Sequence, residues 1–175
     1  MTLTELKKSL NAMEKADLIA LICKMYKGSR QAKDLVDVEL GGAEVEEGLI
    51  RESKEKIWNC FFGKNFSIRN AKSVITDFKK ISKKKESIAE LMLYYVECGV
   101  EFTNTFGDID DRFYYSVAAM FENFVDQVNA LKDDTYYESQ KARIRKVVDD
   151  SDGIGWGFSD DMQRIYHDAF SDSDT

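Results

Sequence analysis

Proline is absent from this chain of 175 residues. Proline is the residue that a helix interior tolerates least, because it lacks the amide donor and clashes with the preceding turn. Apolar residues also recur with the helical period along most of the chain, and no segment of any length alternates as a strand does. The sequence therefore predicts an all-α fold, either a single globular multi-helix bundle or a short array of helical hairpins.

Capping residues and glycines divide the chain into about nine expected helices. Thr2 and Glu5 have the spacing of a capping box, and Gly28, Gly41 and Gly42 are expected to end helices. The expected helices are a short one from Thr2, then residues 15–27, 29–41, 44–62, 67–84 and 87–106, one after Asp110, one from about Asp134 and one from about Ser159. Residues 87–106 are apolar on most of their circumference, which predicts the central helix.

We expect residues 1–170 to form one helical domain, with the helices of 1–42 as a candidate subdomain. Residues 171–175 are expected to be a flexible acidic tail. No heptad pattern persists long enough to indicate a coiled coil, so the sequence does not indicate the oligomeric state.

The composition favours a cytoplasmic protein. The net charge of −7 disfavours indiscriminate binding of phosphates by the whole surface. Cys23, Cys60 and Cys98 are odd in number and far apart, as expected of reduced thiols in the cytosol. No secretory signal is visible, and no apolar run is long enough to span a bilayer, so no membrane partner is expected.

Four motifs resemble an uncharacterised family of small bacterial all-helical proteins, a domain of unknown function. They are DFKK at 77–80, LMLYYVE at 91–97, GVEFTNTFGD at 99–108 and GIGWGF at 153–158. The resemblance covers nearly the whole chain, although the N-terminal helices match less specifically. It implies a bacterial intracellular protein and supplies no activity.

The GIGWGF segment interrupts the helical pattern. Its glycines do not match a dinucleotide fingerprint, since a helix precedes them and Phe158 holds the sixth position. A calcium loop is also incomplete, because Val148 and Ser159 occupy its first and twelfth positions. We expect a structural turn with Gly155 or Gly157 at positive φ and with Trp156 and Phe158 packed in the core. The alternative is a partner or ligand site anchored by Trp156.

Four polar residues interrupt the apolar helix at 87–106. Glu90, Glu97, Glu101 and Asn104 fall within an arc of about 60° on a helical wheel. This stripe is either the solvent edge of the helix or the wall of a polar cleft. The candidate partner or ligand surface consists of Glu97, Glu101, Asp150, Trp156 and Phe158.

Asp149 and Asp150 stand where a helix should end, and the helix dipole disfavours acids there. Either the helix ends earlier or something offsets this repulsion. Pairing with Arg143, Arg145 or Lys146, capping of the following amides and a bound cation are the alternatives.

Residues 64–85 contain eight basic residues and one acid, Asp77. The basic residues lie opposite an apolar arc and form a candidate anion-binding face made of Arg69, Lys72, Lys79, Lys80, Lys83 and Lys84. This face suits nucleic acid, another anionic ligand or an acidic protein, although no aromatic residue on it could stack with bases. A solvated surface is the plainer alternative.

The sequence indicates no catalytic residue, cofactor or metal site. His167 is the single histidine and lies beside Asp168 on the last expected helix. A catalytic role would require the fold to bring it near a nucleophile such as Cys98, and a surface or packing residue is the plainer alternative. No cysteine or histidine spacing typical of zinc is present. We therefore expect a non-enzymatic helical protein-interaction module of the bacterial cytosol, with another protein as its partner. The alternatives are nucleic-acid or anionic-ligand binding through residues 64–85, and a small-ligand or enzymatic pocket near the GIGWGF segment.

Overall fold

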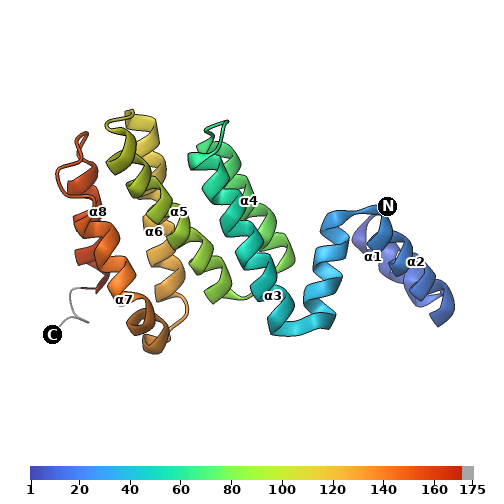
Figure 1. Cartoon of the computed structure of the whole chain (residues 1–175). Coiled ribbons are helices and arrows are strands. Elements are labelled where there is room, and N and C mark those ends of the chain that lie inside the picture. Colours follow the sequence, from blue (N-terminus) through green and yellow to red (C-terminus); the bar gives the residue numbers. More distant parts are fainter. Residues whose placement is uncertain (171–175) are drawn as a thin grey trace. The chain divides into compact units, whose positions relative to one another are not determined.

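The computed structural model of the chain describes residues 1–170. These residues contain eight α-helices and no β-strand (Figure 1). The helices are α1 (Leu3–Asn11), α2 (Lys15–Gly28), α3 (Arg30–Phe62), α4 (Ile68–Ile81), α5 (Lys85–Phe106), α6 (Asp111–Asn129), α7 (Asp134–Asp149) and α8 (Phe158–Phe170). The all-α prediction is confirmed. The expected acidic tail at 171–175 lies outside the described residues.

The structure has eight helices instead of about nine because α3 continues through Gly42. This glycine has φ 69° and ψ −151°, which is not helical, so the backbone kinks where the sequence predicted two separate helices. Glycine adopts positive φ at little steric cost, and the helical residues on either side resume directly. The predicted break is present as a kink, without an intervening loop.

Side-chain caps set several helix boundaries where the sequence placed them. Thr2 and Glu5 form a capping box at the start of α1. The carboxylate of Asp110 accepts a hydrogen bond from the amide of Phe113 at 2.8 Å and so starts α6. Gly107, at φ 87°, ends α5. These local contacts satisfy amide groups that a helix end leaves without partners, which is why they could be read from the sequence.

The described chain divides into two compact units, residues 1–46 and residues from Glu47 onward. The first unit contains α1, α2 and the start of α3, and none of its apolar side chains is buried. Polar contacts join α2 to α3 there: the hydroxyl of Tyr26 donates to Asp37 at 2.9 Å. The second unit contains the rest of α3 and the helices from α4 to α8.

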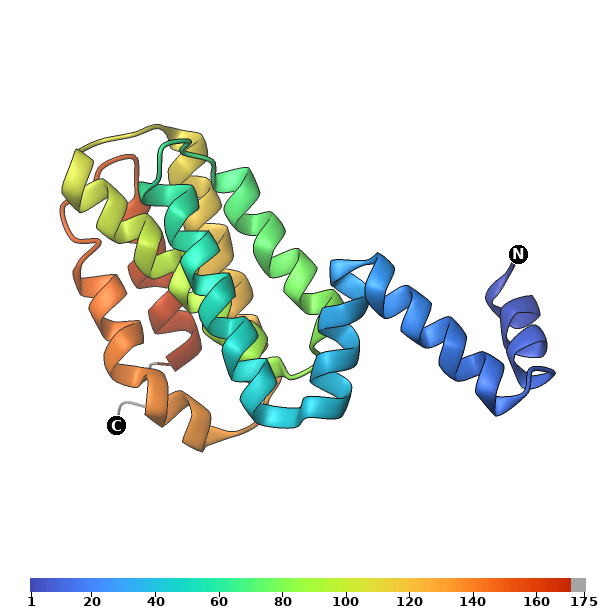
Figure 2. The same cartoon turned by 45° about the vertical axis from the view of Figure 1, so that its right-hand side comes forward.

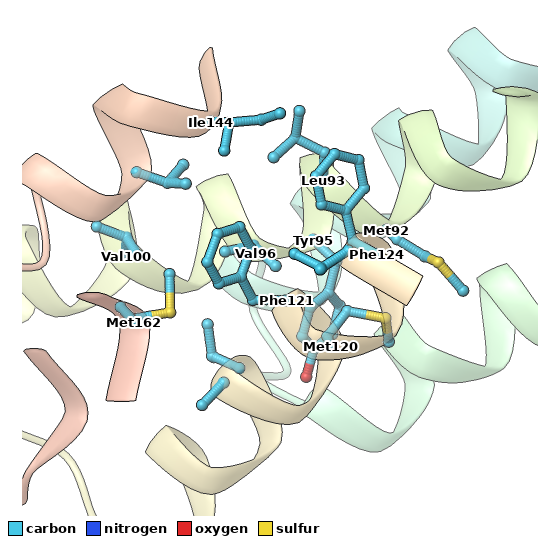
Figure 3. Close-up of a cluster of buried hydrophobic side chains, with 14 of the residues drawn as sticks. Met92, Leu93, Tyr95, Val96, Val100, Met120, Phe121, Phe124, Ile144 and Met162 are labelled. Atoms are coloured by element: carbon cyan, nitrogen blue, oxygen red, sulfur yellow. The ribbon is translucent and has the colours of Figure 1, made fainter. Parts of the chain in front are cut away.

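In the second unit α5 is the central helix, as predicted. It packs against α4, α6 and α7, and α8 packs against α6 and α7 (Figures 1 and 2). Side chains from α5, α6, α7 and α8 meet in a shared apolar core. Figure 3 shows this core around Leu93, Val96, Phe121, Phe124 and Ile144, all of which are buried.

The backbones of α5 and α6 approach each other closely at Gly99. A methyl group added at Gly99 would lie 2.6 Å from the Cγ2 atom of Val117, closer than side-chain carbons approach each other. One helical turn away, the hydroxyls of Tyr95 and Ser116 share a buried hydrogen bond of 2.8 Å between the same two helices. The small residue and the polar contact together set the spacing between α5 and α6.

We expect Gly99→Ala to destabilise the protein. Alanine gains about 1 kcal/mol in helix propensity, but overpacking against the stiff Val117 side chain costs more, and we expect a net loss of about 1–2 kcal/mol. Gly48→Ala is the matched control. An added methyl group there meets only a flexible Arg51 guanidinium, at 3.8 Å, so this variant should gain about 0.5–1 kcal/mol. Urea unfolding of both variants measures the difference. Equal stabilisation by the two substitutions would contradict a tight α5–α6 contact.

Candidate functional site

A cleft of about 540 Å³ opens between α3, α5 and α7 of the second unit. Its wall on α5 includes Glu97, Glu101 and Asn104, which share one face because they are four and three residues apart. Glu101 and Asn104 are also exposed, so this part of the stripe is both the solvent edge of α5 and a wall of the cleft. Asp150, at the C-terminal end of α7, lies on the same cleft.

Arg143 of α7 fixes one side of the cleft through paired hydrogen bonds. Its Nε and Nη2 atoms donate to the two carboxylate oxygens of Glu97, each at 2.8 Å. Its Nη1 atom donates to Glu90 at 2.7 Å, and Lys54 of α3 forms an ion pair with the same carboxylate. A guanidinium that binds a carboxylate through two parallel hydrogen bonds has a defined orientation, so this wall is rigid.

These contacts keep the network charged. Burial opposes the ionisation of Glu90, but the contacts with Arg143 and Lys54 outweigh burial and hold the pKa of Glu90 below its ordinary value. Burial also opposes the charge of Arg143, but the hydrogen bonds that its guanidinium donates to Glu97 and Glu90 raise its pKa above the ordinary value. Glu90 and Arg143 are therefore both charged at neutral pH.

A second ion pair neutralises Asp150. The Nζ atom of Lys146 lies 2.5 Å from the Asp150 carboxylate, and the side-chain amide of Asn104 donates to the Asp150 carbonyl oxygen at 2.8 Å. Of the possible ways to offset the acids at the end of α7, the structure shows pairing with Lys146 for Asp150. Glu101 differs from its neighbours, because no hydrogen bond or ion pair engages its side chain within residues 1–170.

The remaining surface of the cleft is partly aromatic. Trp58 of α3 is 38% exposed and stacks on Phe62 with ring centroids 4.0 Å apart. The side chain of Tyr94 hydrogen-bonds to Cys98, and burial raises the pKa of each to about 12. Because a thiolate is the reactive form of cysteine, Cys98 is a poor nucleophile at neutral pH.

His167 lies away from this cleft. It lines a separate hollow of about 460 Å³ together with Arg145, Asp149 and Tyr166. Cys98 and His167 therefore belong to different concavities, and the cleft contains no cysteine–histidine pair. Within residues 1–170 no group of three histidine, cysteine or acidic side chains is placed to hold a metal ion. The same residues include no helix that is both long enough and apolar enough to cross a bilayer.

The GIGWGF loop differs from its predicted arrangement in one residue. Phe158 is 2% exposed and belongs to the core, as predicted, and Gly157 has the expected positive φ of 71°. The prediction that Trp156 is buried is wrong, since its side chain is 63% exposed and does not line the cleft. Trp156 itself has φ 61°, and its indole nitrogen donates to Asp108 at 2.8 Å. This contact with the α5–α6 loop holds the indole at the surface.

The predicted basic face is not a single helical face. The helix expected at 67–84 ends at Ile81, because Ser82 is extended and its hydroxyl accepts a hydrogen bond from the amide of Lys84 at 3.1 Å. Lys83 and Lys84 therefore lie beyond α4. The other members of the face, all on α4, are Arg69, Lys72, Lys79 and Lys80.

Individual members of this basic group are also less available than the pattern predicted. Lys72 is half-buried, and burial lowers its pKa. Lys80 pairs with Asp77 at 2.7 Å on the same helix. Arg69 and Lys79 are exposed. The solvated-surface alternative thus agrees better with the structure than an anion-binding face.

Sequence reasoning did not single out Lys54, Trp58 or Tyr94 as site residues. Each has a local explanation in the sequence, as a surface charge or as part of an apolar helix. Only the packing of α3 beside α5 brings Trp58 to the cleft and Lys54 to Glu90, and no sequence signal of spacing or charge connects these distant segments.

The Arg143 network should contribute to stability in a pH-dependent way. Arg143→Met leaves the carboxylates of Glu90 and Glu97 short of hydrogen bonds, at a cost of about 1–3 kcal/mol near neutral pH. The pKa of folded Glu90 lies below its ordinary value of 4.5, so its stabilising effect is full above that pH and is lost as the pH falls through the folded value. Arg143→Met should therefore lose less stability than the wild type on acidification.

Urea titrations near neutral pH and at about pH 3.5 measure this difference. Arg164→Met is the control, because Arg164 pairs with Asp161 at 3.3 Å on an exposed surface. It should change stability by less than about 0.5 kcal/mol at either pH. The same acid response in Arg143→Met and the wild type would show that the network is not coupled to stability.

The two aromatic residues of the loop should differ sharply in their effect on stability. Phe158→Ala removes a buried ring and should cost about 3–5 kcal/mol. Trp156→Ala removes an exposed ring and one hydrogen bond, and should cost about 1 kcal/mol. Denaturant midpoints of the two variants compare them directly, and equal losses would restore the buried interpretation of Trp156.

Comparison with known proteins gives a family without an activity. Searches of curated proteins and of solved structures gave no match. A family model described as a family of unknown function, DUF6155, matches residues 1–171. The predicted resemblance to an uncharacterised family is confirmed, and the chain belongs to the family of unknown function DUF6155.

Proposed function

We propose that the cleft between α3, α5 and α7 binds a small ligand that carries a cationic group beside an apolar portion, and that the protein is a non-enzymatic binding protein. The observation that carries this proposal is the state of Glu101. It is the one acid of the cleft wall with no ion pair among the described residues, while Glu97 and Asp150 each have a basic partner.

The charges of the cleft favour a cation. Two ion pairs of the cleft balance their own charges, Glu97 with Arg143 and Asp150 with Lys146. The carboxylate of Glu101 therefore leaves the cleft with an excess of negative charge. A ligand ammonium or guanidinium group would satisfy this carboxylate through charge-assisted hydrogen bonds. An anionic ligand would instead meet Glu101 at close range and would have to break one of the existing pairs.

The apolar surface of the cleft suits the rest of such a ligand. Trp58 and Tyr94 supply aromatic rings, and Val100 and Val147 add aliphatic surface. Aromatic rings attract cations as well as apolar groups. A volume of about 540 Å³ is within the range of small-molecule sites, and the few polar groups on the wall would orient the ligand.

The chemistry of the wall supports binding more than catalysis. A general acid or base needs a pKa near the working pH, and a nucleophile needs a deprotonated form. Burial raises the pKa values of Cys98 and Tyr94 to about 12, and Glu97 and Asp150 are each engaged in an ion pair with a basic side chain. These groups are suited to hold a shape and a charge pattern.

The test uses phenethylamine as the cationic probe and 3-phenylpropionate as its anionic counterpart. We expect phenethylamine to bind with a dissociation constant of roughly 1 mM, as is usual for so small a ligand, and 3-phenylpropionate to bind at least about tenfold more weakly. Chemical-shift perturbation by NMR measures both affinities and locates the site. Glu101→Gln should abolish the preference for the amine, because it removes the excess charge and keeps the side-chain size.

Glu122→Gln is the matched control, since Glu122 is an exposed acid on α6 outside the cleft. It should leave the affinity for phenethylamine unchanged. Shifts that map outside α3, α5 and α7, or an equal affinity for the amine and the acid, would overturn the proposed ligand class.

Protein binding through the GIGWGF loop is a second candidate function. Trp156 favours it, because a large aromatic side chain is exposed and held in place by Asp108. Exposed tryptophans of this kind are common anchors in interfaces. A bacterial cytosolic location stays a prediction from the sequence.

A further inference from the structure

Five aromatic rings form a continuous strip along the last turns of α3 and α5. On α3, Trp58 stacks on Phe62 with ring centroids 4.0 Å apart. Phe62 in turn lies 5.7 Å from Phe102 and 6.2 Å from Phe106, both on α5. Phe66, in the loop between α3 and α4, stacks on Phe102 at 4.7 Å. We call these five residues the aromatic strip.

The aromatic strip is open to solvent on its outer side. Phe66 and Phe106 are 45% and 62% exposed, and the other three rings are at least partly exposed. The buried rings of Phe61 and Phe113 lie behind Phe102, at centroid distances of 6.2 and 5.9 Å, and hold the strip from within. A large apolar surface that is both exposed and backed by the core is typical of an interaction site.

The aromatic strip continues the apolar wall of the cleft. Trp58 belongs to both, since it lines the cleft and stacks on the next ring of the strip. On α5 the cleft residues Glu101 and Thr105 each precede a residue of the strip, Phe102 and Phe106. The polar edge of α5 therefore runs directly beside its aromatic edge. A carboxylate without an ion pair thus lies at the cleft end of the strip.

The openness of the aromatic strip selects the kind of occupant. An alkyl chain or a small ring lying on exposed rings keeps its own outer side in water, so it buries apolar surface on one side only. An amphipathic helix avoids this loss, because its apolar side chains face the strip and its polar side chains face water. A helix that lays one apolar face on an apolar surface is a common mode of recognition between proteins.

The charges at the two ends of the aromatic strip differ in sign. Glu101 lies at the cleft end, whereas Lys64 and Arg69 lie within three residues of Phe66 at the other end. None of the three charged side chains forms an ion pair or a hydrogen bond within the described residues. A complementary helix therefore carries a basic residue at one end of its apolar stripe and none at the other.

We infer that the cleft and the aromatic strip together bind an amphipathic helix of a partner protein, whose lysine or arginine side chain pairs with Glu101. This inference rests on the function proposed above, because the basic side chain takes the place of the cationic group of the ligand. The steps along the strip from Trp58 to Phe66 are 4.0, 5.7 and 4.7 Å. Two to three helical turns of about 5.4 Å each cover that length.

The first test uses a peptide with blocked ends, about four helical turns long, in which a lysine is followed by leucines four, seven and eleven residues later. Alanine and glutamine fill the other positions. The full chain should bind this peptide with a dissociation constant of about 0.1 mM or less, at least about tenfold tighter than phenethylamine. A peptide with glutamate in place of the lysine should bind about tenfold more weakly. Isothermal titration calorimetry measures each affinity.

The second test separates the aromatic strip from the cleft. Phe106→Ala should weaken the lysine peptide by about tenfold and leave phenethylamine unaffected, because the small amine occupies the cleft alone. Tyr115→Ala is the matched control, since Tyr115 is an exposed aromatic residue on α6 outside the strip. It should leave both affinities unchanged. Glu101→Lys should reverse the preference, so that the glutamate peptide binds more tightly than the lysine peptide. Circular dichroism checks that each variant keeps its helices.

The same measurements distinguish this inference from the function on which it rests. If phenethylamine binds in the cleft but the lysine peptide binds no more tightly, the inference is wrong and the proposed ligand class stands. If neither binds, both are wrong. A peptide affinity that Phe106→Ala leaves unchanged would also overturn the inference. So would tight binding of n-octylamine that Phe106→Ala weakens, because the strip would then accept an alkyl amine in place of a helix.

Discussion

The close approach of α5 and α6 at Gly99 is the contact on which the second unit depends. A glycine facing Val117 lets the two backbones come together, and the Tyr95–Ser116 hydrogen bond fixes their register one helical turn away. Side chains on this face of α5 consequently pack in the core with side chains of α6 and α8. Its polar residues therefore gather on the remaining face, toward α3 and α7.

That division gives α5 two roles. Its apolar residues supply a large share of the core, including Leu91, Leu93 and Val96. Its polar face supplies Glu90 and Glu97, which anchor Arg143 from α7 and Lys54 from α3. The ion-pair network therefore does not stabilise the core directly. It fixes the two helices that border the cleft, and the shape of the cleft follows from those ion pairs.

Features with local causes could be predicted from the sequence. Two helix starts depend on contacts within four residues, those of Thr2 with Glu5 and of Asp110 with Phe113. The stripe of Glu97, Glu101 and Asn104 follows from helical periodicity alone. Features that join distant segments could not be predicted. Trp156 is exposed because its indole meets Asp108, 48 residues earlier in the chain, and Arg143 reaches Glu90 across 53 residues. Neither partner can be identified without the packing of the helices.

The position of Trp58 gives the cleft its own optical reporter. The chain has two tryptophans, and Trp58 is the one that lines the cleft, half open to solvent and stacked on Phe62. Indole emission depends on the polarity of its surroundings, so a molecule that displaces water from Trp58 changes the fluorescence of the protein without any attached dye. Trp156, held by Asp108 outside the cleft, provides an internal reference in the same chain.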